Sequence, residues 1–450
     1  MKVAFVTSYY EGSQLDAVTT SFFKHVVADL SKAGHQTVVF ALGDNDFDDP
    51  DGKVVCRKGD LARYNNLHSL ACFPVFSWVF SRAYETYRAH KKSLADYGPD
   101  VVLCVKAIDG MFWSCFENLP VALMSVTPQF EIMRENFDGN LNPVDTSLVT
   151  AVETAAIRAM SAVGCPSENM RRIFIDVAKV PEERTQLYST AVEPQEQPPA
   201  WDGKKGEPHI VYVGTQERYK GIDVLVDAIP ELVKLFPEAL FTVAGESPPL
   251  FGETVPYRDK LRQKLADLDR YVEWLPALNA NQRASLLCSA DIAVFPFRYC
   301  GCMYHVAEAL SLGTAVVTSR VGTLAECLDD GVEALLVEPG CHHSLATAIA
   351  DLSNDAARRA EMSRSARDYI RKHHAKDDAV ADVVRLCVNA IENSNNGAAD
   401  APLKYWIAAL EDFCDKPYLP DLLNDAYAKG FAAGVASVPA PGRSVFSLKR

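Results

Sequence analysis

The residues best suited to do chemistry are a lysine and a glutamate, each close to a glycine turn. Lys220 stands six residues after Gly214, between a predicted strand and a predicted amphipathic helix. Glu308 lies in the first turns of another predicted helix. A lysine beside a helix N-terminus, where free N–H groups carry partial positive charge, would suit a diphosphate. A carboxylate can accept hydrogen bonds from both hydroxyls of a ribose.

Three glycine turns of this block follow predicted strands, at residues 209–213, 292–295 and 315–318. Ligands bind at the carboxyl ends of strands in an open α/β sheet, and the turns should converge there. We therefore expect a phosphate and ribose pocket at this edge. The residues expected to line it are Gly214, Thr215, Arg218, Lys220, Cys300, Gly301, Cys302, Met303, Tyr304, Glu308, Gly322 and Thr323.

Each of the two charged residues also has a purely structural interpretation. A single lysine after a glycine turn is commonly a solvated surface residue. A glutamate early in a helix can serve only to stabilise the dipole of its own helix. The recurrence of three glycine turns on one predicted edge is what favours a binding site.

The elements that must position these residues alternate along the chain. Residues 2–7 form a predicted strand, apolar residues at helical spacing follow over 22–30, and residues 37–42 form the next strand. Such strand–helix–strand units build parallel sheets. The alternation continues to about residue 177 and resumes in a second block at residue 209.

A stretch rich in Pro, Glu, Gln and Gly separates the two blocks. Such a composition is typical of a linker. The predicted organisation is a first doubly wound domain over 1–191, a linker over 192–208, a second doubly wound domain over 209–391, and a helical tail over 392–450.

Composition and charge narrow the classes of partner. The 450 residues carry a formal net charge of −14, which repels nucleic-acid phosphates, so no nucleic-acid partner is expected. No apolar run approaches the roughly 18 residues of a membrane span, and no signal peptide is recognised. Twelve cysteines without Cys-x-x-Cys spacing indicate reduced thiols and predict a cytoplasmic location.

Common cofactor and metal motifs are absent. The loop after the first predicted strand has no Gly-x-Gly-x-x-Gly, and the chain has no Gly-x-x-x-x-Gly-Lys-Ser/Thr, His-Glu-x-x-His or Gly-x-Ser-x-Gly. Cys300 and Cys302 are a close pair, but two further zinc ligands are missing beside them. The sequence predicts neither a bound metal nor a dinucleotide cofactor.

Taken together, residues 211–343 resemble the donor-binding domain of family 4 glycosyltransferases, a large retaining group of the GT-B fold. The resemblance rests on several motifs in the right order, and it is weaker in the N-terminal half, at residues 2–10, 34–35 and 166–168. The matching residues of the second half are Gly214, Lys220, Gly221, Glu308, Ala309, Gly313, Ala315, Val316, Val317, Gly322, Thr323, Glu326, Gly331, Ala334, Leu335, Leu336, Val337, Pro339 and Gly340.

The resemblance implies an α/β protein of the GT-B fold. Two tandem Rossmann-like, doubly wound parallel-sheet domains would face a cleft, and C-terminal helices would cross back to the N-terminal domain. The implied activity moves a sugar from a nucleotide-diphosphate sugar to an acceptor hydroxyl, with retention at the anomeric carbon and without a metal or a cofactor.

The resemblance also assigns roles to residues. Lys220 and Glu308 are the catalytic candidates: Glu308 would hold the ribose of a UDP- or GDP-sugar, and Lys220 would neutralise the leaving diphosphate. The acceptor could be a glycan, a lipid-linked sugar, a protein or a small molecule. The residues expected on the acceptor side are Gly12, Ser13, Lys106, Asp109 and Thr127.

Three departures from the family pattern keep alternatives open. The family's histidine after the fourth or fifth strand of the first domain is not found, and residues 126–128 occupy that region. Cys300 stands where the family has the first glutamate of Glu-x7-Glu, and Thr215 stands where an arginine is common, so Arg218 or Arg298 would have to supply the charge. One alternative is a catalytically impaired partner subunit that binds another protein, or a second copy, through its C-terminal tail. Another is an epimerase of the same fold that acts on a nucleotide sugar.

Overall fold

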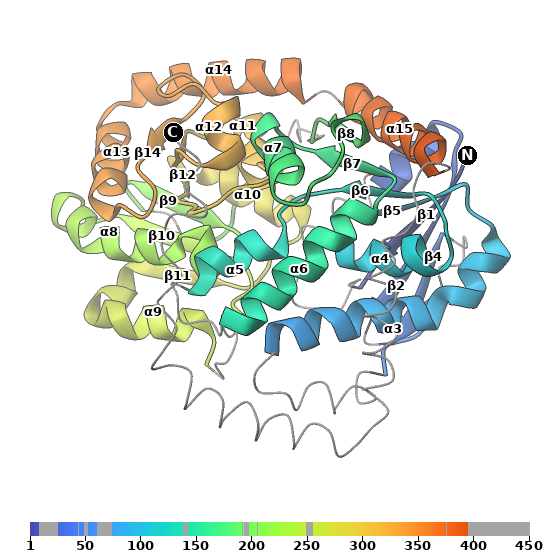
Figure 1. Cartoon of the computed structure of the whole chain (residues 1–450). Coiled ribbons are helices and arrows are strands. Elements are labelled where there is room, and N and C mark those ends of the chain that lie inside the picture. The colour runs from blue at the N-terminus through green and yellow to red at the C-terminus, as the bar shows by residue number, and fades with distance from the viewer. Residues whose placement is uncertain are drawn as a thin grey trace, which may run out of the picture.

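The computed structural model describes residues 1–8, 26–43, 45–48, 53–60, 74–137, 143–190, 192, 198–204, 206–248, 255–374 and 376–394. Gly12, Ser13, most of the predicted linker and nearly all of the predicted tail lie outside these residues. Two parallel sheets follow one another along the chain, each between layers of helices (Figure 1). The predicted pair of doubly wound sheets is thus confirmed.

The first sheet is parallel except for its edge strand β3, which runs antiparallel to β4. Its order is β3-β4-β2-β1-β5-β6-β7-β8, so the chain reverses direction across the sheet between β1 and β5. The strands are β1 (Lys2–Thr7), β2 (Gln36–Gly43), β3 (Phe47–Asp48), β4 (Val54–Lys58), β5 (Val101–Cys104), β6 (Val121–Met124), β7 (Ala162–Cys165) and β8 (Thr185–Leu187).

The second sheet is fully parallel among the described residues, with the order β11-β10-β9-β12-β13-β14. This is the doubly wound order in which the reversal falls between the first and fourth strands, and ligands bind outside the carboxyl ends at that point. The strands are β9 (His209–Val213), β10 (Leu240–Ala244), β11 (Val272–Leu275), β12 (Ile292–Phe295), β13 (Val316–Ser319) and β14 (Leu335–Val337).

Helices cover both faces of each sheet, which explains why most strand residues are apolar and buried. In the first domain they are α3 (Pro74–Tyr97), α4 (Ala107–Phe116), α5 (Gln129–Phe137), α6 (Pro143–Ala159), α7 (Glu168–Asp176) and the short turn η2 (Glu182–Arg184). In the second they are η3 (Arg218–Lys220), α8 (Ile222–Leu235), α9 (Tyr257–Leu265), η4 (Ala266–Tyr271), α10 (Ala280–Ser289), α11 (Tyr304–Leu312), α12 (Gly322–Cys327), α13 (His342–Asn354) and α14 (Ala356–His373).

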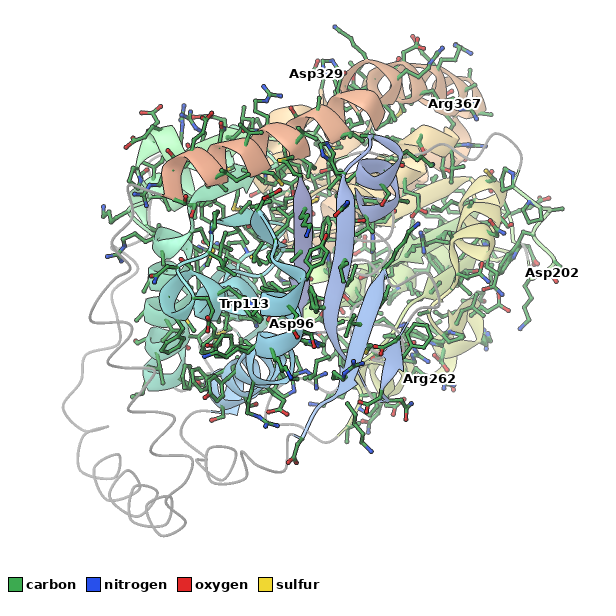
Figure 2. The ribbon with its side chains drawn as sticks, turned by 90° about the vertical axis from the view of Figure 1, so that its right-hand side faces the viewer. Asp96, Trp113, Asp202, Arg262, Asp329 and Arg367 are labelled. Atoms are coloured by element: carbon green, nitrogen blue, oxygen red, sulfur yellow. The ribbon has the colours of Figure 1, made fainter. Side chains whose placement is uncertain are left out.

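Each sheet has an apolar core on both of its faces. In the first domain, α3 and α4 bury aromatic side chains, Trp113 among them, against one face, and α6 adds aliphatic side chains to the same core. Figure 2 shows Trp113 inside this domain, whereas Asp202 and Arg262 lie at the periphery of the other. In the second domain, α8 and α13 cover one face, and α10, α11 and α14 cover the other.

The last described helix, α15 (Lys376–Asn393), returns to the first domain and packs on the outer face of its sheet (Figure 1). Asn389 donates a hydrogen bond to the side chain of Gln186, 2.8 Å away, and Ser189 N–H donates to Asp382 at 2.8 Å. The predicted return of C-terminal helices to the N-terminal domain is therefore present. It begins at residue 376, inside the segment that the sequence analysis assigned to the second domain.

No helix among the described residues is long and apolar enough to cross a membrane.

Candidate functional site

The turn after β9 is built by backbone contacts at glycines. Gly221 has φ +74°, and a Cβ there would lie 1.7 Å from the carbonyl oxygen of Pro296, so only glycine fits. This contact brings Lys220 to the loop after β12. The Lys220 ammonium lies 4.8 Å from the ring centre of Phe297 and 4.9 Å from that of Tyr219, in cation–π geometry.

The positive charge of Lys220 acts on nearby side chains of the loop 300–303 and of α11. Burial first, and then the charges of Lys220 and Arg283, hold the pKa of His305 far below its ordinary value, so this imidazole is neutral. Burial raises the pKa of Cys300 to about 12, although Lys220 opposes the rise. Among the described residues, Lys220 has no carboxylate partner.

The two arginines that the sequence offered as substitutes for the missing cation meet at one carboxylate. Arg298 donates from both terminal nitrogens to Asp223, at 2.6 and 2.7 Å, and the nearest nitrogen of Arg218 lies 3.7 Å from the same side chain. Asp223 stands in the first turn of α8 and is mostly buried. The charge of Arg298 is therefore compensated inside the protein. The neighbouring Thr215 hydroxyl donates to Glu217 at 2.8 Å.

The loop 300–303 and the turn before α12 are joined by hydrogen bonds. Thr323 N–H donates to the carbonyl of Cys300 at 3.0 Å, and its hydroxyl donates to the carbonyl of Gly301 at 2.7 Å. Gly322 has φ +48°, and a Cβ there would meet the Cys300 carbonyl oxygen at 2.3 Å. The structure thus brings these predicted site residues together with Met303, the buried residue that precedes α11.

The side chains of this loop are mostly engaged within the protein. The thiol of Cys300 donates to the carbonyl of Cys302 at 3.3 Å, and the thiol of Cys302 lies 3.5 Å from the Thr190 hydroxyl of the first domain. Tyr304 begins α11, and burial followed by the charge of Glu308 raises its pKa to about 12. Every thiol and phenol here is neutral at physiological pH.

Glu308 has a partner that the sequence did not reveal. Arg283, on α10, donates from Nε to both carboxylate oxygens of Glu308, at 2.7 and 2.9 Å. Each of the two side chains is only 12 % exposed. Nothing in the sequence marks this pair, because the two residues lie on different helices and 25 positions apart.

On the predicted acceptor side, Thr127 lies against the loop 300–303, whereas Asp109 is buried inside the first domain. A Cβ on Gly301 would lie 3.0 Å from the Thr127 hydroxyl oxygen and 2.4 Å from the carbonyl oxygen of Val126, so the two domains touch here. Asp109 is buried and accepts a hydrogen bond from Ser8 N–H at 3.1 Å. Burial raises the pKa of Asp109, and the nearby Lys106 opposes the rise. The Asp109 carboxylate therefore ties β1 to α4.

A second buried acid, which the sequence analysis did not single out, lies close to this edge. Glu153, on α6, accepts hydrogen bonds from the backbone N–H groups of Gln129 and Phe130, both at 2.8 Å. These are free donors at the start of α5. Burial raises the pKa of Glu153 to about 7, against the effect of these two hydrogen bonds.

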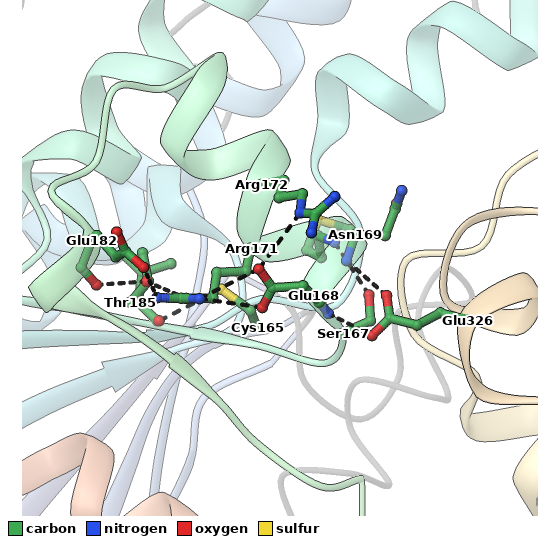
Figure 3. Close-up of polar contacts among 11 residues, drawn as sticks. Cys165, Ser167, Glu168, Asn169, Arg171, Arg172, Glu182, Thr185 and Glu326 are labelled. Atoms are coloured by element: carbon green, nitrogen blue, oxygen red, sulfur yellow. Dashed lines mark hydrogen bonds and ion pairs between the residues drawn. The ribbon is translucent and has the colours of Figure 1, made fainter. Parts of the chain in front are cut away.

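The two domains are joined beside the loop 300–303 by a carboxylate on a helix end. Glu326 of α12 accepts hydrogen bonds from Glu168 N–H at 2.8 Å and from Asn169 N–H at 2.7 Å, at the start of α7 (Figure 3). A carboxylate is favourable at that position because the helix N-terminus carries partial positive charge. The Ser167 hydroxyl, which caps α7, also lies 2.9 Å from the Thr323 hydroxyl.

A further contact between the domains fixes the turn that carries Lys220. Asn136 of α5 accepts a hydrogen bond from Tyr219 N–H at 2.7 Å and lies within 3.4 Å of the Glu217 carboxylate. Tyr299 of the second domain is buried in the core of the first, with its hydroxyl 3.9 Å from the sulfur of Met170. The described structure is thus a closed arrangement of the two domains.

One group of described side chains has the composition of a metal site, namely Glu231, His342 and His343. Glu231 lies nine residues after Ile222, which is about 14 Å along the helix from the start of α8. His343 is 72 % exposed, and its Nδ1 lies 2.5 Å from the Glu231 carboxylate. The group lies apart from the loops described above, and most of the His343 side chain is exposed to solvent.

Comparison with known proteins bears on this geometry. Residues 207–355, which lie mostly in the second domain and end before α14, match the family model described as Glycosyl transferases group 1. The chain is 22% identical over 413 residues to an uncharacterised glycosyltransferase of Methanocaldococcus jannaschii, covering 87% of this chain and 99% of the relative. It is 30% identical over 163 residues to a D-inositol 3-phosphate glycosyltransferase of Corynebacterium kroppenstedtii, covering 36% of each protein.

Among solved structures, a sucrose-phosphate synthase from Thermosynechococcus elongatus superposes with a TM-score of 0.67 at 18% identity. The superposition covers 86% of this chain and 98% of that protein. These findings confirm the GT-B fold and the resemblance to glycosyltransferases of group 1. They support a sugar-transferring enzyme, in agreement with the sequence analysis.

Proposed function

We propose that this protein transfers a sugar from a nucleotide-diphosphate donor to an acceptor hydroxyl, with retention at the anomeric carbon and without a metal. The observation that carries the proposal is the edge of the second sheet between β9 and β12. There, Lys220 has no carboxylate partner among the described residues, while Glu308 lies one helix turn inside α11. A cation and a carboxylate at a topological switch point suit the two ends of a ribose diphosphate.

The proposed chemistry needs few protein groups. The bond between the anomeric carbon and the diphosphate oxygen breaks, and a new bond forms to the acceptor oxygen on the same face of the sugar. The leaving diphosphate takes the acceptor proton, so no side-chain base is required. Lys220 and the start of α11 would stabilise the negative charge that grows on the diphosphate. The closed domains would exclude water and align the acceptor.

The acceptor would approach from the first domain, where Thr127 lies against Gly301. Asp109 has no part in this proposal, because it is buried and accepts a hydrogen bond from the N–H of Ser8, the residue after β1. Lys106, which precedes α4, remains an acceptor-side candidate together with Thr127. We propose UDP or GDP as the nucleotide and leave the acceptor class open among glycans, lipid-linked sugars, proteins and small molecules.

One observation favours a second candidate function. Cys300 is buried and neutral, and its thiol donates to a carbonyl of its own loop, so it cannot accept sugar hydroxyls as a carboxylate would. A protein with this site could bind a nucleotide weakly and serve as a non-catalytic partner of another transferase.

The test is ligand-dependent thermal stability, followed by transfer. UDP, GDP, ADP, CDP and their common sugar conjugates are added to the wild type and to Glu308→Ala. A ligand that binds only the folded protein, at one hundred times its dissociation constant, adds about 2.7 kcal/mol of stability. We expect one base to shift the wild type selectively and Glu308→Ala to lose that shift.

Transfer with the selected donor then separates the two candidates. Release of the nucleoside diphosphate that depends on an added acceptor supports the enzyme. Saturable nucleotide binding without transfer to any acceptor class supports the non-catalytic partner. No shift with any nucleotide rejects the proposed donor site.

A further inference from the structure

The side chain of Arg283 joins α10 to α11, but it does not use all of its hydrogen-bond donors among the described residues. It extends from the first turn of α10, whose start is fixed by a capping box between Asn279 and Gln282. Its Nε reaches both oxygens of Glu308, and Nη1 lies 3.4 Å from the carbonyl oxygen of Leu278. Within the described part of the chain, its Nη2 has no hydrogen-bond partner.

The geometry of this pair leaves acceptor positions on Glu308 unused. An ionised carboxylate offers about four lone-pair positions, two on each oxygen. The single Nε–H of Arg283 is shared between the two oxygens, so each oxygen keeps room for another donor. A ribose presents two neighbouring hydroxyls, and the remaining positions can accept both of them. Arg283 and a ribose can therefore bind Glu308 at the same time.

The pair also has an energetic consequence. A carboxylate that is 12 % exposed, without a cation beside it, would carry a large desolvation penalty and would gain by turning toward water. Arg283 offsets that penalty and restricts the carboxylate to one orientation. A hydroxyl donor then meets an acceptor whose position is already fixed, which lowers the entropic cost of binding.

We infer that Arg283 is a positioning residue for the donor's ribose, acting through Glu308. The inference rests on the proposed function, since it assumes that a nucleotide occupies this edge. Arg283 would not touch the sugar or the diphosphate oxygens through its shared Nε–H. Since Arg283 would act on the ribose through Glu308, its effect on affinity should depend mainly on the ribose hydroxyls.

A merely structural pair makes a different prediction. If Arg283 and Glu308 served only to join α10 to α11, the loss of Arg283 would weaken binding of every nucleotide alike, through a less stable domain. The ribose hydroxyls provide the means to tell the two roles apart.

The experiment measures dissociation constants by calorimetry for the nucleoside diphosphate that the wild type prefers and for its 2′,3′-dideoxy form. The variants are Arg283→Ala and Arg283→Lys. The matched control is Arg367→Ala, since Arg367 donates to the carbonyl of Leu312 at 2.7 Å and so supports the opposite end of α11. Melting temperatures of all variants report their folding.

We expect the wild type to bind the ribose form at least tenfold more tightly than the dideoxy form. Arg283→Ala should weaken the ribose form about tenfold, change the dideoxy form less than twofold, and so remove most of the discrimination. Arg283→Lys, which keeps a charge but changes its geometry, should fall between the two and provides the test if the alanine variant does not fold. Arg367→Ala should retain the wild-type ratio.

Two results would overturn the inference, and they are distinguishable. Wild-type discrimination that survives in the Arg283 variants assigns the pair to structure alone and leaves the proposed function intact. A wild type that binds no nucleoside diphosphate rejects both the inference and the proposed function.

Discussion

The carboxyl edges of the two sheets share a topology, but different chemical groups make the contacts that hold each edge together. At the edge of the second sheet, glycines let one backbone segment touch another, as Gly221 does with Pro296 and Gly322 with Cys300. At the edge of the first sheet, buried carboxylates bind backbone N–H groups, as Asp109 does with Ser8 and Glu153 with the start of α5.

The difference shows how one topology can serve two purposes. Backbone contacts at glycines consume no side-chain charge, so Lys220 keeps its charge without a described carboxylate partner. The first edge uses its carboxylates on its own backbone, and these acids are no longer available to a substrate. Charged residues at a switch point are therefore evidence for a site only after their partners are known. The comparison can be challenged at four positions.

The largest effect is expected from Gly221→Ala. Its Cβ would overlap the Pro296 carbonyl, and φ +74° is unfavourable for alanine, so we expect a loss of about 3 to 5 kcal/mol in the free energy of unfolding or a failure to fold. Gly340→Ala is the matched control, with φ +72° and no atom within 4 Å of the new Cβ. It should lose only about 1 to 2 kcal/mol. Equal losses in urea unfolding would show that the backbone contact is unimportant.

Lys220→Ala should act on catalysis rather than on folding. Removal of a cation from a developing diphosphate charge should lower the rate of transfer by about 10² to 10³-fold, by analogy with other electrostatic donors. Lys234→Ala, at the exposed far end of α8, should transfer at the wild-type rate. Initial rates at saturating donor measure both. A fully active Lys220→Ala would remove the main reason to place the diphosphate at this edge.

At the first edge, Glu153 should make stability depend on pH. Its pKa is raised from 4.5 to about 7 by burial, so the folded protein keeps a proton that the unfolded chain has released. The free energy of unfolding should fall as the pH rises from about 4.5 through 7, by at most about 3 kcal/mol from this group.

Glu153→Gln is neutral at every pH and should flatten that fall, as measured by urea unfolding at half-unit steps of pH. Glu183→Gln, at an exposed position of η2, is the control and should keep the wild-type slope. A slope unchanged in Glu153→Gln would show that other groups cause the pH dependence.

The smallest effect is expected where the two edges meet. Glu326→Ala leaves the N–H groups of Glu168 and Asn169 without their carboxylate, at a cost of about 1 kcal/mol, as for the loss of a helix cap. Glu361→Ala, exposed on α14, should have no measurable effect. If Glu326→Ala also leaves the unfolding free energy unchanged, the contact between α12 and α7 contributes nothing to the closed arrangement.

Much of the fold could be predicted from the sequence because its strands are short apolar runs bounded by turns. The predicted strands at 37–42, 209–213 and 292–295 lie within about one residue of β2, β9 and β12. Neither β4 nor the long helix α3 was predicted. The buried face of α3 carries Glu85, Thr86 and His90 among its aromatic residues, and these polar residues interrupt the apolar periodicity.

The site was partly predictable for a similar physical reason. Glycines at strand ends are visible in a sequence, and they brought the 214–221, 300–303 and 322–323 segments to one edge. Ion pairs between helices leave no local signal, so neither the Arg283 partner of Glu308 nor the Asp223 partner of Arg298 could be foreseen. The roles given to Lys220, Glu308, Lys106 and Thr127 remain predictions.

At Gly301 the two domains are in direct contact, with no room for a side chain between them. A single added methyl would meet the Val126 carbonyl oxygen at 2.4 Å and the Met170 side chain at 2.7 Å, both across the domain boundary. Alanine, serine and valine at position 301 would therefore place side chains of increasing size between the two domains. Such a series would hold the domains apart by graded amounts, and it would allow opening to be varied without altering Lys220, Glu308 or any charged group of the site.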